Sequence, residues 1–189
     1  METTREKLIN ATFEEVYSNG YQGASLGDIL AKAGVHKGSM YHFFASKKEM
    51  ALTAITEKMV GNSYRNILEK DKPCLEHFFA ILRDASKRDF KRGCPLANLV
   101  QEMSNLDEDF DRTLRAMYKE FRGVFKSIYD HAVLMNELTL TCNTTKLALF
   151  TVVVLEGAIL SAKASGNEQD YLDAVECLID YISSNTKEV

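Results

Sequence analysis

Apolar residues recur three and four positions apart along most of the 189-residue chain, which is the spacing of one face of an α-helix. The alternation typical of half-buried strands is scarce, and only two prolines, Pro73 and Pro95, interrupt the pattern. The spacing therefore predicts an all-α fold. Short helices within residues 1–50 precede longer ones in residues 51–189, so we expect two domains that meet at that boundary.

The short helices have recognisable start and stop signals. A first helix stops at Asn19-Gly20, and a second runs from the N-cap Ser25 to Gly34. A third covers about residues 36–44. A capping box that begins at Ser46 then starts a fourth helix, predicted to continue to about residue 70. Helices this short bury little surface alone, so we expect them to pack on one another as a compact unit.

Five longer amphipathic helices are predicted after residue 72, separated by breaks rich in glycine, proline and asparagine. Residues 138–142 have the propensity for a short strand, but without a partner strand we predict a loop there. The expected helices cover residues 75–91, 95–105, 107–136, 143–165 and 168–184.

Charge is distributed unevenly along the chain. The net charge of −4 excludes a nucleic-acid-binding protein that is basic over its whole surface. Between Ile29 and Lys48, however, there are four lysines, two histidines and no acidic residue. A solvated helix surface would produce such a run, and so would a surface that binds phosphate groups, which needs only a local basic patch.

The four cysteines give no sign of a metal site or of a disulfide framework. Their separations of 20, 48 and 35 residues do not match the spacing of metal ligands, so we expect reduced thiols, no metal and no cofactor. The N-terminal segment lacks the apolar stretch of a signal peptide, and the apolar run Leu147–Leu155 is too short to cross a bilayer. We expect a cytoplasmic protein without a membrane partner.

The two short helices that meet at Gly34 have the arrangement of a helix-turn-helix. In that motif the second helix enters the major groove of DNA, and a glycine permits the sharp turn. The exposed residues of the second helix would be His36, Lys37, Ser39 and His42, which can donate to phosphates and base edges. A short-helix, glycine, short-helix pattern by itself is also common in other helical proteins.

A longer string of residues makes the interpretation specific. Residues 25–29 read Ser-Leu-Gly-Asp-Ile, residues 33–35 Ala-Gly-Val, residues 37–44 Lys-Gly-Ser-Met-Tyr-His-Phe-Phe and residues 46–49 Ser-Lys-Lys-Glu, after Phe13 and Gly20-Tyr21. This string resembles the DNA-binding domain of the TetR family of transcriptional regulators. The resemblance implies that residues 1–50 are a helix-turn-helix DNA-binding domain and that double-stranded operator DNA is the partner.

The resemblance also implies roles for individual residues. Lys37, Ser39 and His42 would lie in the groove, Tyr41 would contact a phosphate-sugar unit, and Gly38 would allow close approach. Lys48 would meet a phosphate together with the backbone amides of the fourth helix. Phe43 and Phe44 are expected in the core. The family usually has Ser or Thr at the position of His36, which could still cap the helix or contact a phosphate. The predicted DNA-binding set is Ser25, His36, Lys37, Gly38, Ser39, Tyr41, His42, Lys47 and Lys48.

In the larger domain, residues 92–99 resemble a GC-x-x-x-N-L segment of one branch of the family. The resemblance implies a homodimer in which the last two long helices of each subunit pack as a four-helix bundle. Apolar and small residues form a stripe along each of the two helices, although a monomer could also bury these stripes in its own core. These residues are Leu147, Phe150, Val153, Val154, Gly157, Ala158 and Ser161 on one helix, and Leu172, Val175, Leu178, Ile179 and Ile182 on the other.

The family resemblance further implies a pocket for an unknown small-molecule effector in residues 51–189. An apolar molecule with a polar or cationic group would suit clustered aromatics beside one acid. Ordinary core is the favoured explanation for each aromatic, whereas Glu156 is equally well explained as a buried residue paired at a dimer interface. The candidates are Phe78, Met103, Tyr118, Phe121, Phe125, Phe150 and Glu156, with Phe79, Phe90 and Tyr129 as further aromatics.

Cys94 is a candidate thiol sensor for electrophiles or oxidants. It precedes Pro95 at a predicted helix N-terminus near Lys91 and Arg92, and both the helix dipole and the cations would favour thiolate. The alternative is a small buried residue at a helix corner. An enzyme that uses Cys94 with His77 or His131 is a rival class, but no catalytic motif accompanies these residues. The lack of such a motif argues against an enzyme, and the family resemblance implies a repressor that binds a palindromic operator as a dimer and is released by a ligand.

Overall fold

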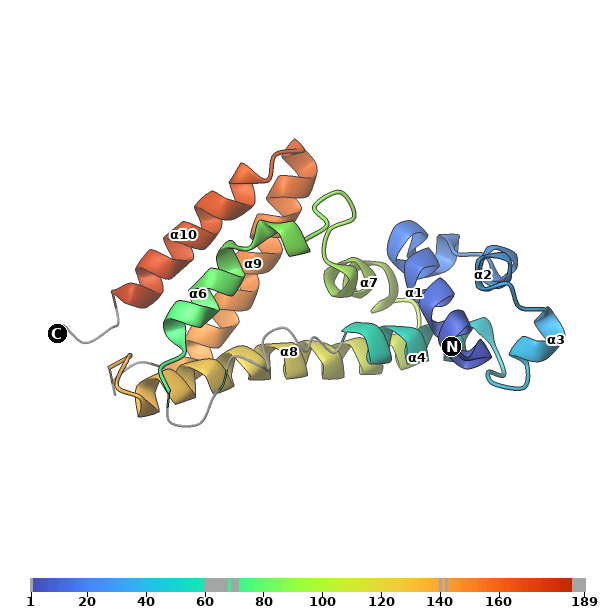
Figure 1. Cartoon of the computed structure of the whole chain (residues 1–189), viewed down its shortest axis with the longest axis horizontal. Coiled ribbons are helices and arrows are strands. Elements are labelled where there is room, and N and C mark those ends of the chain that lie inside the picture. The colour runs from blue at the N-terminus through green and yellow to red at the C-terminus, as the bar shows by residue number, and fades with distance from the viewer. Residues whose placement is uncertain (1, 60–67, 69–71, 140, 142, 185–189) are drawn as a thin grey trace. The chain divides into compact units, whose positions relative to one another are not determined.

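The computed structural model describes residues 2–59, 68, 72–139, 141 and 143–184, and Figure 1 shows its helices in chain order. All the regular elements among the described residues are helical, which confirms the all-α prediction. The chain divides into two compact units. The first contains residues 1–60 and 95–117, and the second contains residues 61–94 and 118–189. The division into a DNA-binding domain, residues 1–50, and a ligand-binding and dimerisation domain, residues 51–189, stays a prediction.

The first unit contains the short helices of the N-terminus together with α7 and the beginning of α8. Helix α1 continues three residues past the predicted stop because the chain kinks at Gly20 (φ 73°) and then resumes a helical course. The helices are α1 (Thr4–Gly23), α2 (Leu26–Ala33), α3 (Lys37–Met40), α4 (Lys47–Met59), α7 (Pro95–Met103) and α8 (Glu108–Leu134). The predicted extension of α4 to residue 70 lies outside the described residues.

Helix α3 is shorter than predicted, and this changes the position of one aromatic residue. The helix has a single turn, after which residues 41–43 turn away. Met40 and Phe44 point inward and are buried, whereas Phe43 is 44% exposed. The prediction that Phe43 belongs to the core was therefore wrong, because residues four apart face inward here and Phe43 lies between them.

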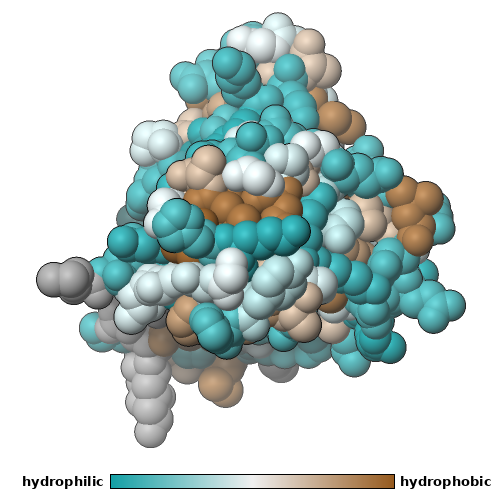
Figure 2. Space-filling view, turned by 90° about the vertical axis from the view of Figure 1, so that its right-hand side faces the viewer, coloured by the Kyte–Doolittle hydropathy of each residue, from teal (hydrophilic) through white to brown (hydrophobic). Residues whose placement is uncertain are grey.

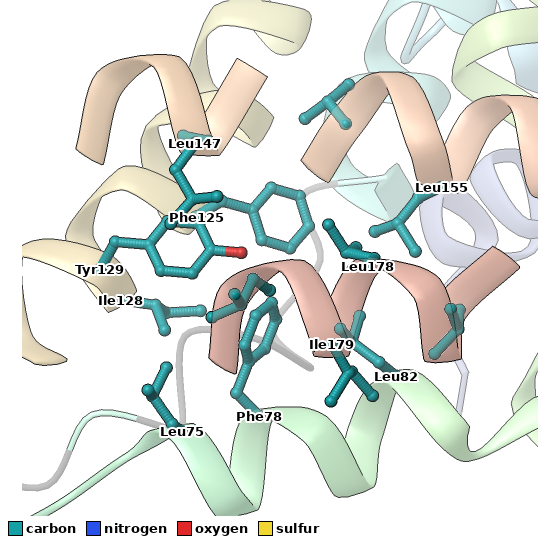
Figure 3. Close-up of a cluster of buried hydrophobic side chains, with 14 of the residues drawn as sticks. Leu75, Phe78, Leu82, Phe125, Ile128, Tyr129, Leu147, Leu155, Leu178 and Ile179 are labelled. Carbon is teal, nitrogen blue, oxygen red and sulfur yellow. The ribbon is translucent and has the colours of Figure 1, made fainter. Parts of the chain in front are cut away.

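The second unit is built from α6 (Leu75–Arg83), the rest of α8, α9 (Thr144–Ser165) and α10 (Gln169–Ser183). Helices α9 and α10 lie side by side in opposite directions in Figure 1, joined at Gly166-Asn167-Glu168. Side chains from all four helices meet in one core, and Figure 3 shows Phe78, Phe125, Tyr129, Leu155 and Leu178 converging there. Two hydrogen bonds satisfy buried tyrosines: Tyr129 with Thr151 (2.6 Å) and Tyr171 with the carbonyl of Leu82 (2.8 Å).

The helix predicted over residues 75–91 ends at Arg83 instead. Asp84 leaves the helical region (φ −75°, ψ 82°), and its carboxylate accepts a hydrogen bond from the Ser86 hydroxyl. Such local side-chain bonds compete with the helix, so a short 3₁₀ turn, Ala85–Lys87, follows in its place.

Helix α9 is apolar on nearly all sides. By length and composition it could cross a membrane, since its 22 residues exceed the nine-residue run considered in the sequence. One side of the helix is buried against the core, where Leu147, Val152 and Leu155 lie. A core helix of a protein dissolved in water passes the same test, so the finding is weak evidence for a membrane span.

Candidate nucleic-acid interface

A tight turn joins α2 to α3. The Ser25 hydroxyl accepts a hydrogen bond from the backbone N–H of Asp28 (3.0 Å), so it caps α2 as predicted. At the other end Gly34 is left-handed (φ 64°), and the N–H of Val35 donates to the carbonyl of Leu30 (3.1 Å). The turn positions α3 directly after α2, with Met40 buried beneath it.

The outward surface of α3 and the turn that follows it gathers most of the predicted DNA-binding residues. His36, Lys37, Gly38, Tyr41 and His42 are exposed and Ser39 is half-buried; we call these six residues the recognition face. The phenol of Tyr41 is 52% exposed. Figure 2 shows the side of the molecule that lies at the right of Figure 1, where α3 is, and its surface is mostly hydrophilic with hydrophobic patches.

The structure sharpens two assignments on the recognition face. His36 occupies the N-cap position of α3, but its side chain makes no capping hydrogen bond. A Cβ added at Gly38 would meet no protein atom within 4 Å, so the surface at this glycine is open to an approaching partner.

Three of the four lysines between Ile29 and Lys48 bind groups of the protein itself. Lys32 pairs with Glu15 (2.6 Å), and the ammonium of Lys47 donates to the carbonyl of Tyr21 (2.6 Å). Burial lowers the pKa of Lys47. Lys48 pairs with two aspartates. For Lys37, which is exposed, no ion-pair partner occurs among the residues that the structure describes.

Glu102 of α7 binds the kink of α1, a contact that the sequence pattern did not indicate. Its carboxylate accepts hydrogen bonds from the backbone N–H groups of Tyr21 (3.0 Å) and Gln22 (2.8 Å). A Cβ at Gly20 would lie 2.7 Å from Glu102 Oε2, so the glycine supplies both the positive φ and the room. This contact joins α1 to α7 within the first unit.

Replacing Glu102 by glutamine is expected to lower the stability of the first unit by about 1–2 kcal/mol, because a charge-assisted acceptor for two backbone donors is lost. A urea-unfolding midpoint at fixed protein concentration measures the change. Glu108→Gln, at an exposed position at the start of α8, is the matched control. An equal midpoint for the Glu102 variant and the control would contradict the proposed contribution.

The predicted effector residues do not form one group. Phe78 and Phe125 lie in the core with Phe121 packed against it; the ring centroids of Phe78 and Phe125 are 5.8 Å apart in a tilted arrangement, and those of Phe121 and Phe125 are 5.0 Å apart edge to face. Phe150 lies on the opposite, outer side of α9, 41% exposed, with its ring 5.0 Å from that of Tyr181. Met103 is buried within the first unit.

Glu156, Tyr118 and Cys94 come together in the second unit. The Glu156 carboxyl is mostly buried, and this burial raises its pKa, while a hydrogen bond with Cys94 and the charge of Arg88 oppose the rise. Burial also raises the pKa of Tyr118, and the nearby Glu156 adds to the effect. The carboxyl of Glu156 is thus a neighbour of Cys94, a contact that the sequence did not predict.

The two cations expected beside Cys94 lie in other surroundings. Arg92 pairs with Asp89 (2.6 Å), and Lys91 lines a separate hollow of about 460 Å³ at the α9–α10 corner. The other residues of this hollow are Phe90, Ala162, Lys163, Gly166, Asn167 and Glu168. Of the ten candidate effector residues, Phe90 alone lines it.

The two apolar stripes predicted for the last helices have different positions. On α10, Val175, Leu178, Ile179 and Ile182 are buried in the core of the unit. On α9, Leu147 and Ala158 are buried, whereas an outer set remains exposed. We call this set, Leu149, Phe150, Val153 and Leu160, the outer face of α9; Val153 and Leu160 are 55% and 58% exposed.

A capped helix, a left-handed glycine turn and a second helix with an exposed polar surface define a DNA-binding protein of the helix-turn-helix class. The chain belongs to the TetR family of bacterial transcriptional regulators. Residues 8–54 match the family described as bacterial regulatory proteins, tetR family, and residues 72–178 match the tetracyclin repressor-like C-terminal domain. The family resemblance seen in the sequence is confirmed, while the branch inferred from residues 92–99 stays a prediction.

Relatives and solved structures agree with this assignment. An uncharacterized HTH-type transcriptional regulator of Lactococcus lactis is 29% identical and covers 100% of this chain and 96% of its own. The transcriptional repressor NemR of Escherichia coli is 28% identical over 64% of this chain and 63% of its own. A TetR-family regulator from Cytophaga hutchinsonii superposes with a TM-score of 0.87 at 21% identity, covering 98% and 96% of the two chains.

A further structure shows the fold with its nucleic acid. The TetR-family regulator CifR, solved as a cysteine mutant with double-stranded operator DNA of 26 base pairs, has a TM-score of 0.79 and 21% identity. It covers 93% of this chain and 94% of its own. Members of the family bind operator DNA and typically act as dimers, and the proteins similar to this chain are regulators rather than enzymes.

Proposed function

We propose that this chain is a cytoplasmic, ligand-responsive repressor that binds a palindromic operator as a homodimer and leaves it when a small molecule binds. The observation that carries the proposal is the recognition face, where polar and basic groups are exposed over the buried Met40 and Phe44. The repressor NemR among the relatives supports the direction of regulation.

The outer face of α9 supports the dimer. Apolar side chains this exposed on one helix form a patch that costs free energy in water and marks an interface. A second copy of the chain would cover it by the same face, as a two-fold axis requires. Two recognition helices could then reach successive major grooves, roughly 34–36 Å apart.

The effector is proposed to bind at the group formed by Glu156, Tyr118 and Cys94. Tyr118 packs against the same core as Phe121 and Phe125, whose rings meet edge to face. A mostly buried carboxyl and a phenol beside aromatic rings would orient a small apolar molecule with one polar group. A ligand that binds better to one conformation of the second unit would shift the protein away from the DNA-binding state.

Selection of bound duplexes from a random DNA pool tests this function. The dimer is expected to enrich an inverted repeat, and screening of small molecules is then expected to find one that releases the DNA. Failure to enrich any sequence, together with an affinity for DNA that does not depend on salt, would overturn the proposal.

A second candidate function, favoured by the position of Cys94 directly before the N-terminus of α7, is thiol-based sensing of electrophiles or oxidants. Cys94 is half-buried, and the CifR neighbour was solved as a cysteine mutant. Cys74 is a poor competitor, because burial raises the pKa of its thiol to about 12. Cys177 is exposed and provides an internal reference for reactivity.

Limiting N-ethylmaleimide followed by peptide mass spectrometry tests the sensor. We expect Cys94 to be alkylated before Cys177 although it is less exposed, and we expect the alkylated protein to lose DNA. The variant Cys94→Ser should keep DNA binding after the same treatment. Faster labelling of Cys177 than of Cys94, or unchanged DNA binding after Cys94 is labelled, would exclude this function.

A further inference from the structure

Lys48 at the start of α4 is held by two acidic side chains from the start of α8. Its ammonium lies 2.8 Å from Asp107 Oδ2 and 2.5 Å from Asp109 Oδ2. All three residues belong to the first unit. The cation that the family resemblance assigns to a DNA phosphate is therefore bound to two carboxylates in this structure.

The two carboxylates are fixed where they are by α8 itself. Asp107 caps the helix: its Oδ1 accepts hydrogen bonds from the N–H groups of Asp109 (3.0 Å) and Phe110 (3.2 Å), which leaves Oδ2 for Lys48. Asp109 also pairs with Arg112. The hydrogen bonds with Asp107 and Asp109 raise the pKa of Lys48 to about 12, and those with Lys48 lower the pKa of both acids. All three groups are thus charged at neutral pH.

We propose that Asp107 and Asp109 compete with a DNA phosphate for Lys48, so that the start of α8 restrains the affinity of the protein for DNA. The inference rests on the proposed function. A lysine ammonium is one compact charge, and a phosphate that reaches it would come close to two carboxylates of its own sign. Binding of the phosphate must therefore displace the ion pairs or bear the repulsion.

The ion pairs of Lys48 with the two aspartates are weak enough for a phosphate to replace the carboxylates. Between 27% and 44% of the area of each of the three side chains is exposed, and exposed ion pairs contribute little net stability. Helix α8 continues from these aspartates to Leu134, and its residues Phe125 and Tyr129 pack in the core of the second unit. A displacement of α8 would change how well the two carboxylates hold Lys48.

The test is the double variant Asp107→Asn/Asp109→Asn, in which the new side chain at position 107 still caps α8 because asparagine is as good an N-cap as aspartate. Fluorescence anisotropy measures its affinity for random-sequence duplex DNA at several salt concentrations. We expect an affinity roughly three- to tenfold above that of the parent, as for two exposed ion pairs. The plot of log affinity against log salt should also become steeper by about 0.9, the value for one additional phosphate contact.

Two controls isolate the role of Lys48. Glu108→Gln/Asp111→Asn removes the same charge from the same turns of α8, and Asp111 pairs with Arg115 instead of Lys48, so this variant should gain less affinity and keep the parent's salt slope. Lys48→Ala should lower affinity little in the parent and strongly in the Asp107→Asn/Asp109→Asn protein.

Equal gains for both double variants, or an equal effect of Lys48→Ala in both proteins, would overturn the competition. An affinity of the Asp107→Asn/Asp109→Asn protein at or below that of the parent would also overturn it. A parent protein that binds no DNA would instead contradict the proposed function itself.

Discussion

Replacing Lys37 and Tyr41 together by alanine is expected to lower affinity for the selected operator by about a hundredfold while leaving the fold intact. Both side chains are exposed on the recognition face, so their removal creates no cavity. Loss of one groove contact and one phosphate contact costs about 1–3 kcal/mol each, roughly tenfold or more apiece. Anisotropy with the selected duplex measures the affinity, and circular dichroism confirms that helix content is unchanged.

The matched control for this variant is Lys119→Ala, which removes an exposed lysine from α8 in the second unit. It should bind the operator like the parent. If the Lys37/Tyr41 variant kept the affinity of the control, α3 would not be the helix that reads DNA, and the proposed interface would be wrong.

The second large effect is expected from Val153→Asp on the outer face of α9. Val153 is 55% exposed, so the subunit should fold as before. A carboxylate at the centre of an apolar interface must be desolvated without a partner, which costs several kcal/mol and would separate the dimer. Sedimentation analysis should show a monomer where the parent is a dimer, and operator binding should be lost with it.

Leu134→Asp provides the comparison, since Leu134 is even more exposed than Val153 and belongs to a different helix, at the end of α8. This variant should sediment as the parent does. A Val153→Asp protein that remained dimeric would show that another surface forms the interface.

The helices that local signals define were predicted well. Helix α2 begins after Ser25 and ends at Gly34 as expected, and the start of α9 was predicted to within one residue. Such helix ends can be predicted because an N-cap residue or a left-handed glycine determines the conformation of the turn in which it lies. The end of α6 was missed since Asp84 binds Ser86, a local bond that apolar spacing does not reveal.

The recognition face was also predictable, but the roles of the neighbouring lysines were not. Glu102 binds the backbone of Tyr21 from 81 positions away, and Lys48 binds Asp107 from 59 positions away. Both contacts depend on how α7 and α8 pack beside α1 and α4, and no pattern within one helix encodes that packing. The contact of Cys94 with Glu156 escaped prediction for the same reason.

We propose that this chain reads a palindrome as a dimer through the recognition faces of its two subunits. The most direct test is to titrate the parent protein against the selected duplex and against the same duplex with one half-site scrambled, and to measure the stoichiometry by sedimentation. We expect two protomers on the intact duplex, a fall in affinity with salt, and loss of most of the affinity when one half-site is scrambled. Binding of a single protomer that is indifferent to the second half-site would contradict it.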